Sequence, residues 1–522
     1  MHALVHAFMM RGIDALACEV EVHIAQHGLP QISVVGLPDA AIRESVERVR
    51  QAIEATGLEV PRHHVIVNLA PAGTRKEGAV YDLPIAVGVL AASGATVATR
   101  TGAPDLSKWM LAGELALDGR LRPIRGAVSA ALLARDSGRG LVLPAVNAIE
   151  AELVPGARVV GVTTLGEVVA FLRGEAPLVP STGTPSCDGL AFESGDGVEW
   201  PVASTGLAAL DFREVKGQSV ARRAMLIAAA GEHNVLLLGP PGCGKTMLAR
   251  ALTGILPPMS AEQSLEVLRV ASCAGGIPIG VARNGTLHVP RPVRAPHHGA
   301  SAAAIIGGGS GGRPGEVTLA HGGVLFLDEL PEYRRDVLEG LREPLESGSV
   351  SIARASGTVT YPAKALLVAA MNPTPQGSRR GGGGGRRSAH DPLGRISGPI
   401  LDRIDLHVEL RRLSARDLAR SKPGPSSESM RQLVLAARSR ATARQGNIPN
   451  GALPGALLDR HCPLDAAASE LLLRGLDDLG LSARGYDKVR RIARTIADLD
   501  ASPSITAEII AEALQYRALE RR

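Results

Sequence analysis

Aromatic side chains are nearly missing from this chain, because Phe, Tyr and Trp together make up only 2% of its 522 residues. Proteins that hold single-stranded nucleic acid mainly by stacking need several aromatic rings. The composition therefore argues against a stacking platform, and backbone amides, Lys and Arg would have to do most of any such binding. The net charge of +5 is mildly basic, which permits a nucleic-acid partner without requiring one.

Cysteine is also scarce, and its placement excludes two common uses. The five cysteines are scattered, and no pair has the spacing of zinc ligands. An odd number does not suit a disulfide framework. We therefore expect reduced thiols at Cys18, Cys187, Cys243, Cys273 and Cys462.

Long apolar runs and a secretion signal are lacking as well. The first twenty residues do not combine a basic start, an apolar core and a small-residue cleavage site. No uncharged apolar run approaches the ~18 residues that a membrane-spanning helix needs. We therefore expect a cytoplasmic protein without a membrane partner.

Composition and periodicity divide the chain into four parts. Residues 1–173 mix short apolar strands with amphipathic helices, and residues 174–204 are rich in Pro, Gly and Ser, as is typical of a linker. Residues 205–412 alternate strands and helices, which predicts an α/β domain with a parallel sheet. Residues 413–522 are helical in pattern. A chain of this length has room for several cores.

The strongest motif is "NVLLLGPPGCGKTMLARAL", in which an apolar strand over residues 235–238 enters a glycine-rich loop and a helix follows. This is the context that a phosphate-binding P-loop requires. Backbone amides and the helix N-terminus would hold the phosphates of ATP. Lys245 would reach the β- and γ-phosphates, and the Thr246 hydroxyl would ligate Mg²⁺. The predicted nucleotide-binding residues are Gly239, Pro240, Pro241, Gly242, Cys243, Gly244, Lys245 and Thr246.

Polar residues at the ends of two later strands suit the hydrolysis of a bound nucleotide. The apolar run 324–327 leads into Asp328, a second candidate Mg²⁺ ligand, and Glu329, a candidate base for the attacking water. Without the P-loop, such a pair would simply mark the end of a strand. The next strand, "ALLVAAM", ends at Asn372, which could orient the lytic water or simply cap the strand.

Two arginines are candidates for stabilising the charge of a transferring phosphoryl group, which suits the fork of donors on a guanidinium. They are Arg403 in "PILDRIDLHVEL" and Arg484 in "GLSARGYDKVRRIARTIADL", with Arg395 as a weaker competitor to Arg403. A lone arginine is otherwise more often a solvated surface charge.

Together these motifs resemble an AAA+ ATPase of the magnesium-chelatase-like group, within which the ComM/YifB family is most similar. The resemblance runs through "RPVRAPHHGASAAAIIGGG", "RPGEVTLAHGGVLFLDELPEYRRDVLEGLREPLESGSVSIARASGTVTYPAKALLVAAMNP" and "RISGPILDRIDLHVEL", and covers nearly the whole chain except the linker. It implies a P-loop AAA+ domain with a C-terminal helical lid, and a hexameric ring. It also implies that Arg403 is an arginine finger and Arg484 a sensor 2 residue. The family includes a DNA helicase that drives branch migration during natural transformation, so single-stranded or branched DNA is the implied partner.

The N-terminal part resembles the Lon protease domain, an α+β fold that uses a Ser–Lys dyad. Here the serine position falls at about Val80 and the lysine position at Val128, and neither side chain can do that chemistry. The resemblance therefore implies a protease-dead domain that serves assembly or recognition.

Four functions remain to be separated. They are a DNA motor, a chelatase-like ATPase that remodels a protein partner, a protease or unfoldase, and a nucleotide-gated scaffold. The missing dyad, and the lack of any aromatic residue between Gly275 and Gly323, disfavour the protease or unfoldase. The intact Lys245, Asp328 and Glu329 disfavour the scaffold. The Lon-like part disfavours the chelatase-type remodeller.

Several segments offer weaker candidates. Four arginines could contact phosphates: Arg283, Arg291, Arg294 and Arg354. A pore tip could be formed by Ile305, Ile306 and Gly307. For each of these residues, a solvated or packing role is expected at least as much as the functional one. For the pair His297 and His298 we favour a structural or subunit-contact role over a metal. The glycine–arginine loop 379–387 follows "NPTPQG". Family members commonly carry a cysteine cluster here that suits a structural metal, but residues 373–402 of this chain contain no cysteine. We therefore predict no metal beyond Mg²⁺. We expect a tether whose arginines, Arg379, Arg380, Arg386 and Arg387, are solvated or touch phosphates.

Overall fold

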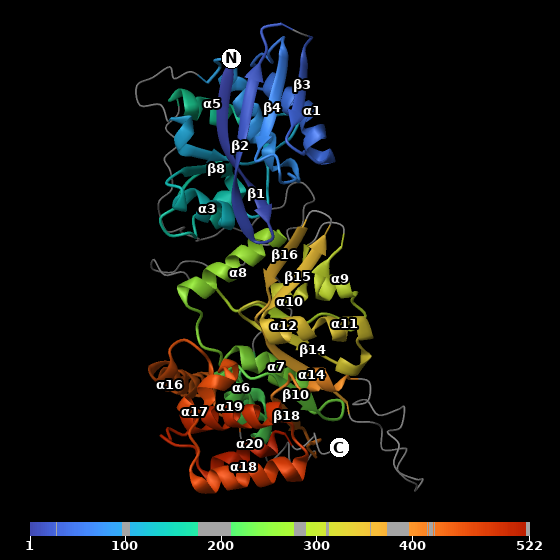
Figure 1. Ribbon diagram of the computed structural model, residues 1–522, viewed down its shortest axis with the longest axis vertical. Coiled ribbons are helices and arrows are strands. Elements are labelled where there is room, and N and C mark those ends of the chain that lie inside the picture. The colour runs from blue at the N-terminus through green and yellow to red at the C-terminus, as the bar shows by residue number, and fades with distance from the viewer. Residues whose placement is uncertain are drawn as a thin grey trace. The chain divides into compact units, whose positions relative to one another are not determined.

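The computed structural model describes residues 1–27, 29–96, 105–175, 210–275, 289–309, 313–354, 357–372, 396–414, 416, 421 and 423–517. The chain forms two compact units, which Figure 1 shows as ribbons. The first unit comprises Met1–Ala203, Ala261–Pro290 and Ser351–Tyr361, and the second comprises Ser204–Ser260, Arg291–Val350 and Pro362–Arg522. Most of the predicted linker lies outside the described residues.

The first unit is built on a mixed seven-stranded sheet with the order β3-β4-β2-β1-β5-β8-β9. β2 pairs antiparallel with both β1 and β4, and the other neighbouring strands pair parallel. The strands are β1 (His2–Arg11), β2 (Asp14–Ile24), β3 (Gln31–Val35), β4 (His64–Ala70), β5 (Trp109–Leu111), β8 (Gly140–Pro144) and β9 (Arg158–Val162), beside the small ribbon β6 (Glu114–Leu115) and β7 (Leu121–Arg122). The helices are α1 (Ala40–Ala55), α2 (Asp82–Ala92), α3 (Ala127–Asp136), α4 (Ala145–Ala151) and α5 (Leu165–Arg173).

Helix α1 illustrates how the sequence produces these elements. The Asp39 carboxylate caps the helix by accepting from the Ile42 amide at 2.9 Å. Ile42, Val49 and Ile53 recur with the helical period and are buried, which fixes α1 against the sheet core.

Two segments of the sequence region 205–412 pack within the first unit. Helix α8 (Ala261–Ala274) carries Arg269, which forms an ion pair with Asp14 and donates to the Ile13 carbonyl at 3.4 Å. The second segment is the hairpin of β15 (Ser349–Arg354) and β16 (Gly357–Pro362). It packs against the turn between β1 and β2 so closely that a Cβ on Gly12 would lie 2.8 Å from Val359 Cγ1. The β1–β2 turn thus contacts both segments. The first unit therefore contains these two segments in addition to Met1–Ala203, while the second unit begins at Ser204.

The end of α8 is held by hydrogen bonds of Ser272 to residues of the same unit, among them the buried Glu150. The Ser272 carbonyl accepts from the Gly126 amide at 3.1 Å, and the Ser272 hydroxyl accepts from the Val128 amide at 3.3 Å. Glu150, which is 3% exposed, accepts from Asn147 Nδ2 at 2.6 Å. Burial raises the pKa of Glu150 to about 7, although hydrogen bonds from Asn147 and Ser272 oppose the rise.

The second unit contains the predicted parallel sheet, with the order β11-β14-β17-β10-β18. Its strands are β10 (Val235–Leu238), β11 (Val293–Arg294), β14 (Val324–Leu327), β17 (Leu366–Met371) and β18 (Leu406–Glu409). The residues of β10, β14 and β17 are apolar and buried throughout, as expected for central strands covered on both faces.

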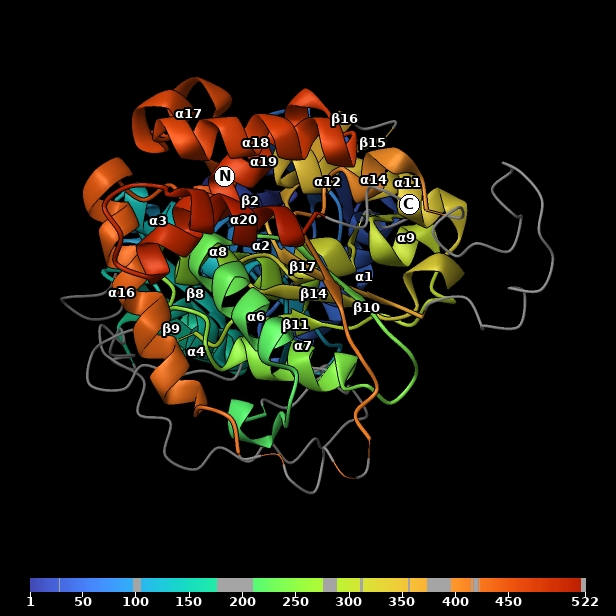
Figure 2. The same cartoon turned by 90° about the horizontal axis from the view of Figure 1, so that it is seen from below.

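Helices surround this sheet and form a bundle at the C-terminal end of the chain. The helices near the sheet are α6 (Ser219–Gly231), α7 (Lys245–Thr253), α9 (Ala302–Ile305), α10 (Glu316–Leu319), α11 (Arg335–Gly340), α12 (Arg342–Ser347) and α14 (Gly398–Leu401). The C-terminal bundle consists of α16 (Ser427–Gln445), α17 (Gly455–His461), α18 (Ala466–Leu479), α19 (Ala483–Leu499) and α20 (Ala507–Gln515). Helix α6 packs against α16, α19 and β18, and Figure 2 shows α19 beside α18 and α20. The predicted α/β fold with C-terminal helices is confirmed, whereas the Lon-like N-terminal domain stays a prediction.

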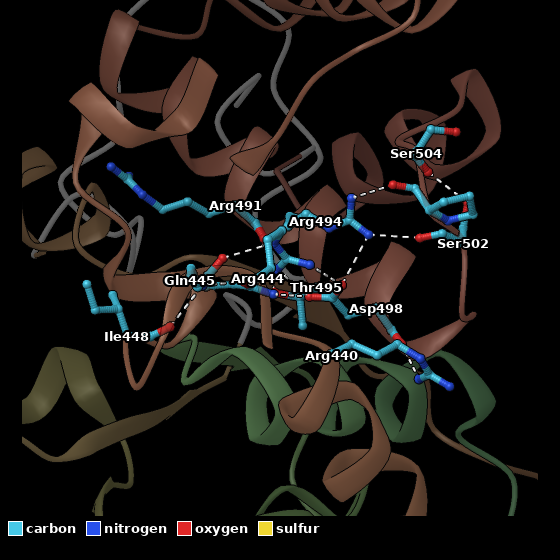
Figure 3. Close-up of polar contacts among 12 residues, drawn as sticks. Arg440, Arg444, Gln445, Ile448, Arg491, Arg494, Thr495, Asp498, Ser502 and Ser504 are labelled. Carbon is cyan, nitrogen blue, oxygen red and sulfur yellow. Dashed lines mark hydrogen bonds and ion pairs between the residues drawn. The ribbon is translucent and has the colours of Figure 1, made fainter. Parts of the chain in front are cut away.

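A buried carboxylate organises the bundle. Asp498, 2% exposed, accepts from Arg444 through both of its oxygens at 2.7 and 2.8 Å and forms a 3.1 Å ion pair with Arg494 (Figure 3). Asn450 Nδ2 donates to the same carboxylate at 2.8 Å. Arg494, itself 2% exposed, also donates to the Ser502 carbonyl at 2.9 Å. Buried charges need such complete pairing, so Asp498 holds three segments of the bundle together.

Across the described residues, none of the helices combines the length and the apolar character that a bilayer crossing demands.

We expect Asp498→Ala to lower the free energy of unfolding by about 3–5 kcal/mol, because it leaves two largely buried guanidinium groups without their carboxylate. Urea titration followed by circular dichroism measures the loss. Asp478→Ala on the exposed face of α18 is the matched control and should stay within about 0.5 kcal/mol of the parent. An equal effect of the two changes would contradict the role given to Asp498.

We expect the first unit to lose stability as pH rises through about 7, because Glu150 is held protonated by burial and its ordinary pKa is lower. The stability that its neutral form contributes is complete below the ordinary pKa and is lost above about 7, at a cost of up to about 3 kcal/mol. Glu150→Gln should remove this fall, whereas Glu59→Gln on the surface should not. Hydrogen exchange of β8 amides between pH 5 and 8.5 measures it, and identical profiles in all three proteins would refute it.

Candidate functional site

The loop Gly239–Gly244 joins the carboxyl end of β10 to the start of α7. Gly242 and Gly244 have φ values of 76° and 96°, in the left-handed region that favours glycine. Gly239 has no room for a side chain, since a Cβ would lie 2.7 Å from Cys243 Sγ. The chain therefore turns sharply and presents the amides at the start of α7, which is the geometry of an anion-binding helix N-terminus.

Lys245 is the first residue of α7, and its side chain folds back under this loop. Its Nζ donates to the Gly239 carbonyl at 2.7 Å, to the Pro240 carbonyl at 3.2 Å and to Asn372 Oδ1 at 2.7 Å. The residue is 9% exposed. Asn372 directly follows β17, whose Met371 is in register with Leu238 of β10. The structure thus brings together two residues that the sequence predicted for one site although they are far apart along the chain.

Asp328 and Glu329 stand at the same edge, after β14 on the other side of β17. Asp328 Oδ1 accepts from the Glu329 amide at 2.9 Å. Glu329 has a φ of 51°, which is uncommon for a residue with a side chain and is found mainly where function or packing demands it. The carboxylate of Asp328 and the exposed hydroxyl of Thr246 are oxygen donors of the kind that Mg²⁺ prefers, so these residues fit a magnesium–nucleotide complex.

His298 contacts the Glu329 side chain, which sequence reasoning did not foresee. Its Nδ1 lies 3.5 Å from Glu329 Oε2. The His298 ring lies 4.1 Å from that of His297, centroid to centroid, and edge-on to Tyr333 at 6.4 Å. Tyr333 also donates its hydroxyl to the Pro296 carbonyl at 2.6 Å, which fixes the segment that carries the histidines. No sequence pattern near His297 and His298 indicates that His298 contacts Glu329.

Arg403 lies at the opposite edge of the sheet from the loop. It precedes β18, which runs parallel to β10 with Leu406 opposite Val235. Asn234, just before β10, donates to the Arg403 carbonyl at 3.1 Å. The four residues of β10 separate the two edges by roughly 13 Å at the usual rise per residue. Arg403 is therefore positioned away from the phosphate loop of its own chain.

The side chain of Arg403 is held on α12. Its Nη2 contacts the Glu346 carboxylate, and its Nη1 donates to the Pro399 carbonyl at 2.7 Å. Hydrogen bonding and charge from Arg403, with a further contribution from Arg484, lower the pKa of Glu346 below its ordinary value. The two arginines predicted to stabilise phosphoryl charge thus share one carboxylate neighbour.

The weaker candidates have packing roles where the structure describes them. Arg291 donates to the carbonyls of Pro257 and Gly322 at 2.8 and 2.5 Å, and Arg294 binds both oxygens of Glu316 at 2.6 and 2.8 Å. Ile305 is fully buried, which does not suit a pore tip. Arg283, Arg395 and the glycine–arginine loop lie outside the described residues, as does the side chain of Arg354.

Comparison with family models finds three matches along the chain. Residues 211–418 match magnesium chelatase, subunit ChlI, and residues 424–517 match the C-terminal part of that subunit. Residues 20–147 match a further model described as subunit ChlI of Mg-chelatase. The first two matches cover the sheet and the C-terminal bundle of the second unit.

Two of the individual relatives match nearly the whole chain. The chain is 41% identical to the competence protein ComM of Haemophilus influenzae, over 99% of this chain and 98% of the relative. It is 40% identical to the uncharacterized protein YifB of Salmonella typhimurium, over 99% and 97%. The chain is 26% identical to the magnesium-chelatase 38 kDa subunit of Rhodobacter capsulatus, over 56% of this chain and 82% of that subunit.

We expect Asn372→Asp to weaken nucleotide binding at least about tenfold, because a carboxylate would hold the Lys245 ammonium by charge and repel incoming phosphates. Asn372→Ala removes only one acceptor of Lys245, so binding should stay within about threefold while turnover falls. Titration with a fluorescent ATP analogue, beside steady-state ATPase rates, separates the two variants. Equal affinities for both would show that Asn372 does not face the phosphates.

Proposed function

Since this chain belongs to the ComM/YifB family of magnesium-chelatase-like proteins, as its motifs predicted, we propose that it is an ATP-hydrolysing ring motor that acts on DNA. In this proposal six copies form the ring. The motor is a helicase that promotes branch migration during recombination or natural transformation.

The phosphate loop and its neighbours supply the ATPase part of the proposal. The loop amides and Lys245 bind the phosphates, Thr246 and Asp328 hold Mg²⁺, and Glu329 activates water while Asn372 orients it. Bound magnesium would neutralise phosphate charge and fix the γ-phosphate relative to these groups. The 2.7 Å contact between Lys245 and Asn372 supports this arrangement, because it brings the lysine and the proposed water-orienting residue within one hydrogen bond.

The position of Arg403 is the single observation that supports assembly of the chain into a ring. An arginine at the amino edge of a parallel sheet is remote from the phosphate loop at the carboxyl edge of the same sheet. It serves hydrolysis only if a second copy of the chain presents its phosphate loop there. Such a head-to-tail contact repeats around a closed ring, and Arg484 is proposed to act at the same interface.

DNA as the partner is supported by the full-length similarity to a protein named for competence. The alternative is an ATPase that remodels a protein partner, as the chelatase family descriptions suggest. Against this, the magnesium-chelatase subunit matches only 56% of the chain, whereas ComM matches nearly all of it.

We expect Glu329→Gln to bind ATP and branched DNA but to hydrolyse ATP at least about a hundredfold more slowly, because the group that activates water is lost. The parent protein should displace a labelled strand from a three-strand junction, and the variant should not. Glu332→Gln, three residues further on, is the matched control and should retain both activities.

Salt dependence gives the same experiment a second readout. DNA-stimulated ATP turnover should fall as the salt concentration rises, because binding of the DNA phosphates releases counterions and is therefore weakened by salt. Normal turnover in Glu329→Gln would refute the catalytic assignment. No response to DNA at low salt would favour the protein-remodelling alternative.

A further inference from the structure

The segment that carries Arg403 is held by the C-terminal bundle through a largely buried ion pair. Asp405, two residues after Arg403, accepts from Lys488 Nζ on α19 at 2.9 Å. The two side chains are 15% and 13% exposed. Burial alone would raise the pKa of Asp405, but the Lys488 ammonium and His233 hold it below its ordinary value, so the carboxylate is ionised.

Further bonds to the same segment come from both the bundle and the sheet. Arg517, beyond the end of α20, donates to the carbonyls of Ile404 and Asp405 at 2.6 and 3.2 Å. From the side of the sheet, the Asn234 amide donates to Asp405 Oδ2 at 3.2 Å, and His233 Nδ1 lies 3.5 Å from the same oxygen. Asp405 thus has partners on both sides, and Lys488 is the charged partner that α19 provides.

Arg484 is carried by the same helix. It lies four residues before Lys488 on α19, and such residues share one helix face. A displacement of α19 would therefore carry Arg484 and pull on Asp405 together. The two arginines proposed for the subunit interface are joined through one salt bridge, although 81 positions separate them in the sequence.

We propose that the Lys488–Asp405 pair makes Arg403 and the C-terminal bundle one rigid piece, so that each subunit offers its arginine to the neighbouring site only while its own bundle is docked. Lys488 is then a positioning residue, which acts through Arg403 and touches no nucleotide. This inference rests on the proposed action of Arg403 at the site of another subunit.

Mixed rings test the inference. Glu329→Gln is expected not to hydrolyse ATP but keeps Arg403, whereas Arg403→Ala keeps Glu329 and the phosphate loop but lacks the Arg403 side chain. Each variant alone is expected to be inactive. An equal mixture should regain roughly a quarter of the parent turnover, since that fraction of head-to-tail interfaces pairs an intact site with an intact arginine.

Lys488→Met is then added to one variant at a time. Methionine keeps most of the side-chain volume and removes the charge. In the Glu329→Gln chain, which donates the arginine, it should reduce the regained turnover at least about tenfold. In the Arg403→Ala chain it should leave the regained turnover unchanged, because that chain has no Arg403 side chain for Lys488 to position. Lys364→Met, at a lysine whose side chain is 57% exposed, is the matched control and should have no effect in either chain.

The outcomes are distinguishable. Equal losses with Lys488→Met in either chain would mean general damage to the fold and would overturn the positioning role. Full turnover with Lys488→Met in the arginine-donating chain would overturn it as well. If the simple mixture regains nothing, the proposed action of Arg403 on a neighbour fails, and the inference that rests on it fails too.

Discussion

The common direction of the five strands in the second unit divides its chemistry between two edges of one sheet. Loops that follow parallel strands meet at the carboxyl edge, so residues from β10, β14 and β17 come together there without being close in sequence. The amino edge receives the segment before β18, where Arg403, Asp405 and the bundle residue Lys488 gather. With four-residue strands between them, neither set can take over the work of the other within one subunit. This separation is what makes a ring of several copies a physical requirement of the proposed mechanism.

Local sequence patterns predicted several of the strands and the polar residues that the structure gathers at the carboxyl edge of the sheet. Apolar runs over residues 235–238 and 324–327 coincide with β10 and β14, because a buried parallel strand needs apolar residues on both faces. The contact of Lys245 with Asn372 arises because β10 and β17 are neighbours in the sheet, an order that the sequence analysis did not predict.

Contacts between distant segments could not be predicted in the same way. Nothing in the sequence near Arg269 indicates Asp14, and nothing near His298 indicates Glu329, because each pair depends on how loops and inserts pack rather than on periodicity. The grouping of α8 and the β15–β16 hairpin with the first unit is of this kind. So is the pair Asp405 and Lys488, which looks like two ordinary surface charges when read along the chain. Charged residues are usually assumed to be solvated, and only the fold reveals which of them are buried and paired.

The hydrogen bonds of Lys245 have a consequence for the energetics of a catalytic cycle. Its ammonium already has three protein acceptors, so a phosphate oxygen that binds it exchanges one good partner for another. The net gain on binding is smaller than the strength of the new bond, as for any hydrogen bond made by exchange. When a phosphate leaves, the Lys245 ammonium can again donate to these acceptors, so product release does not leave a buried charge without a partner. Such a site binds phosphate less tightly but releases it faster, as repeated cycles of the proposed ATP hydrolysis would require.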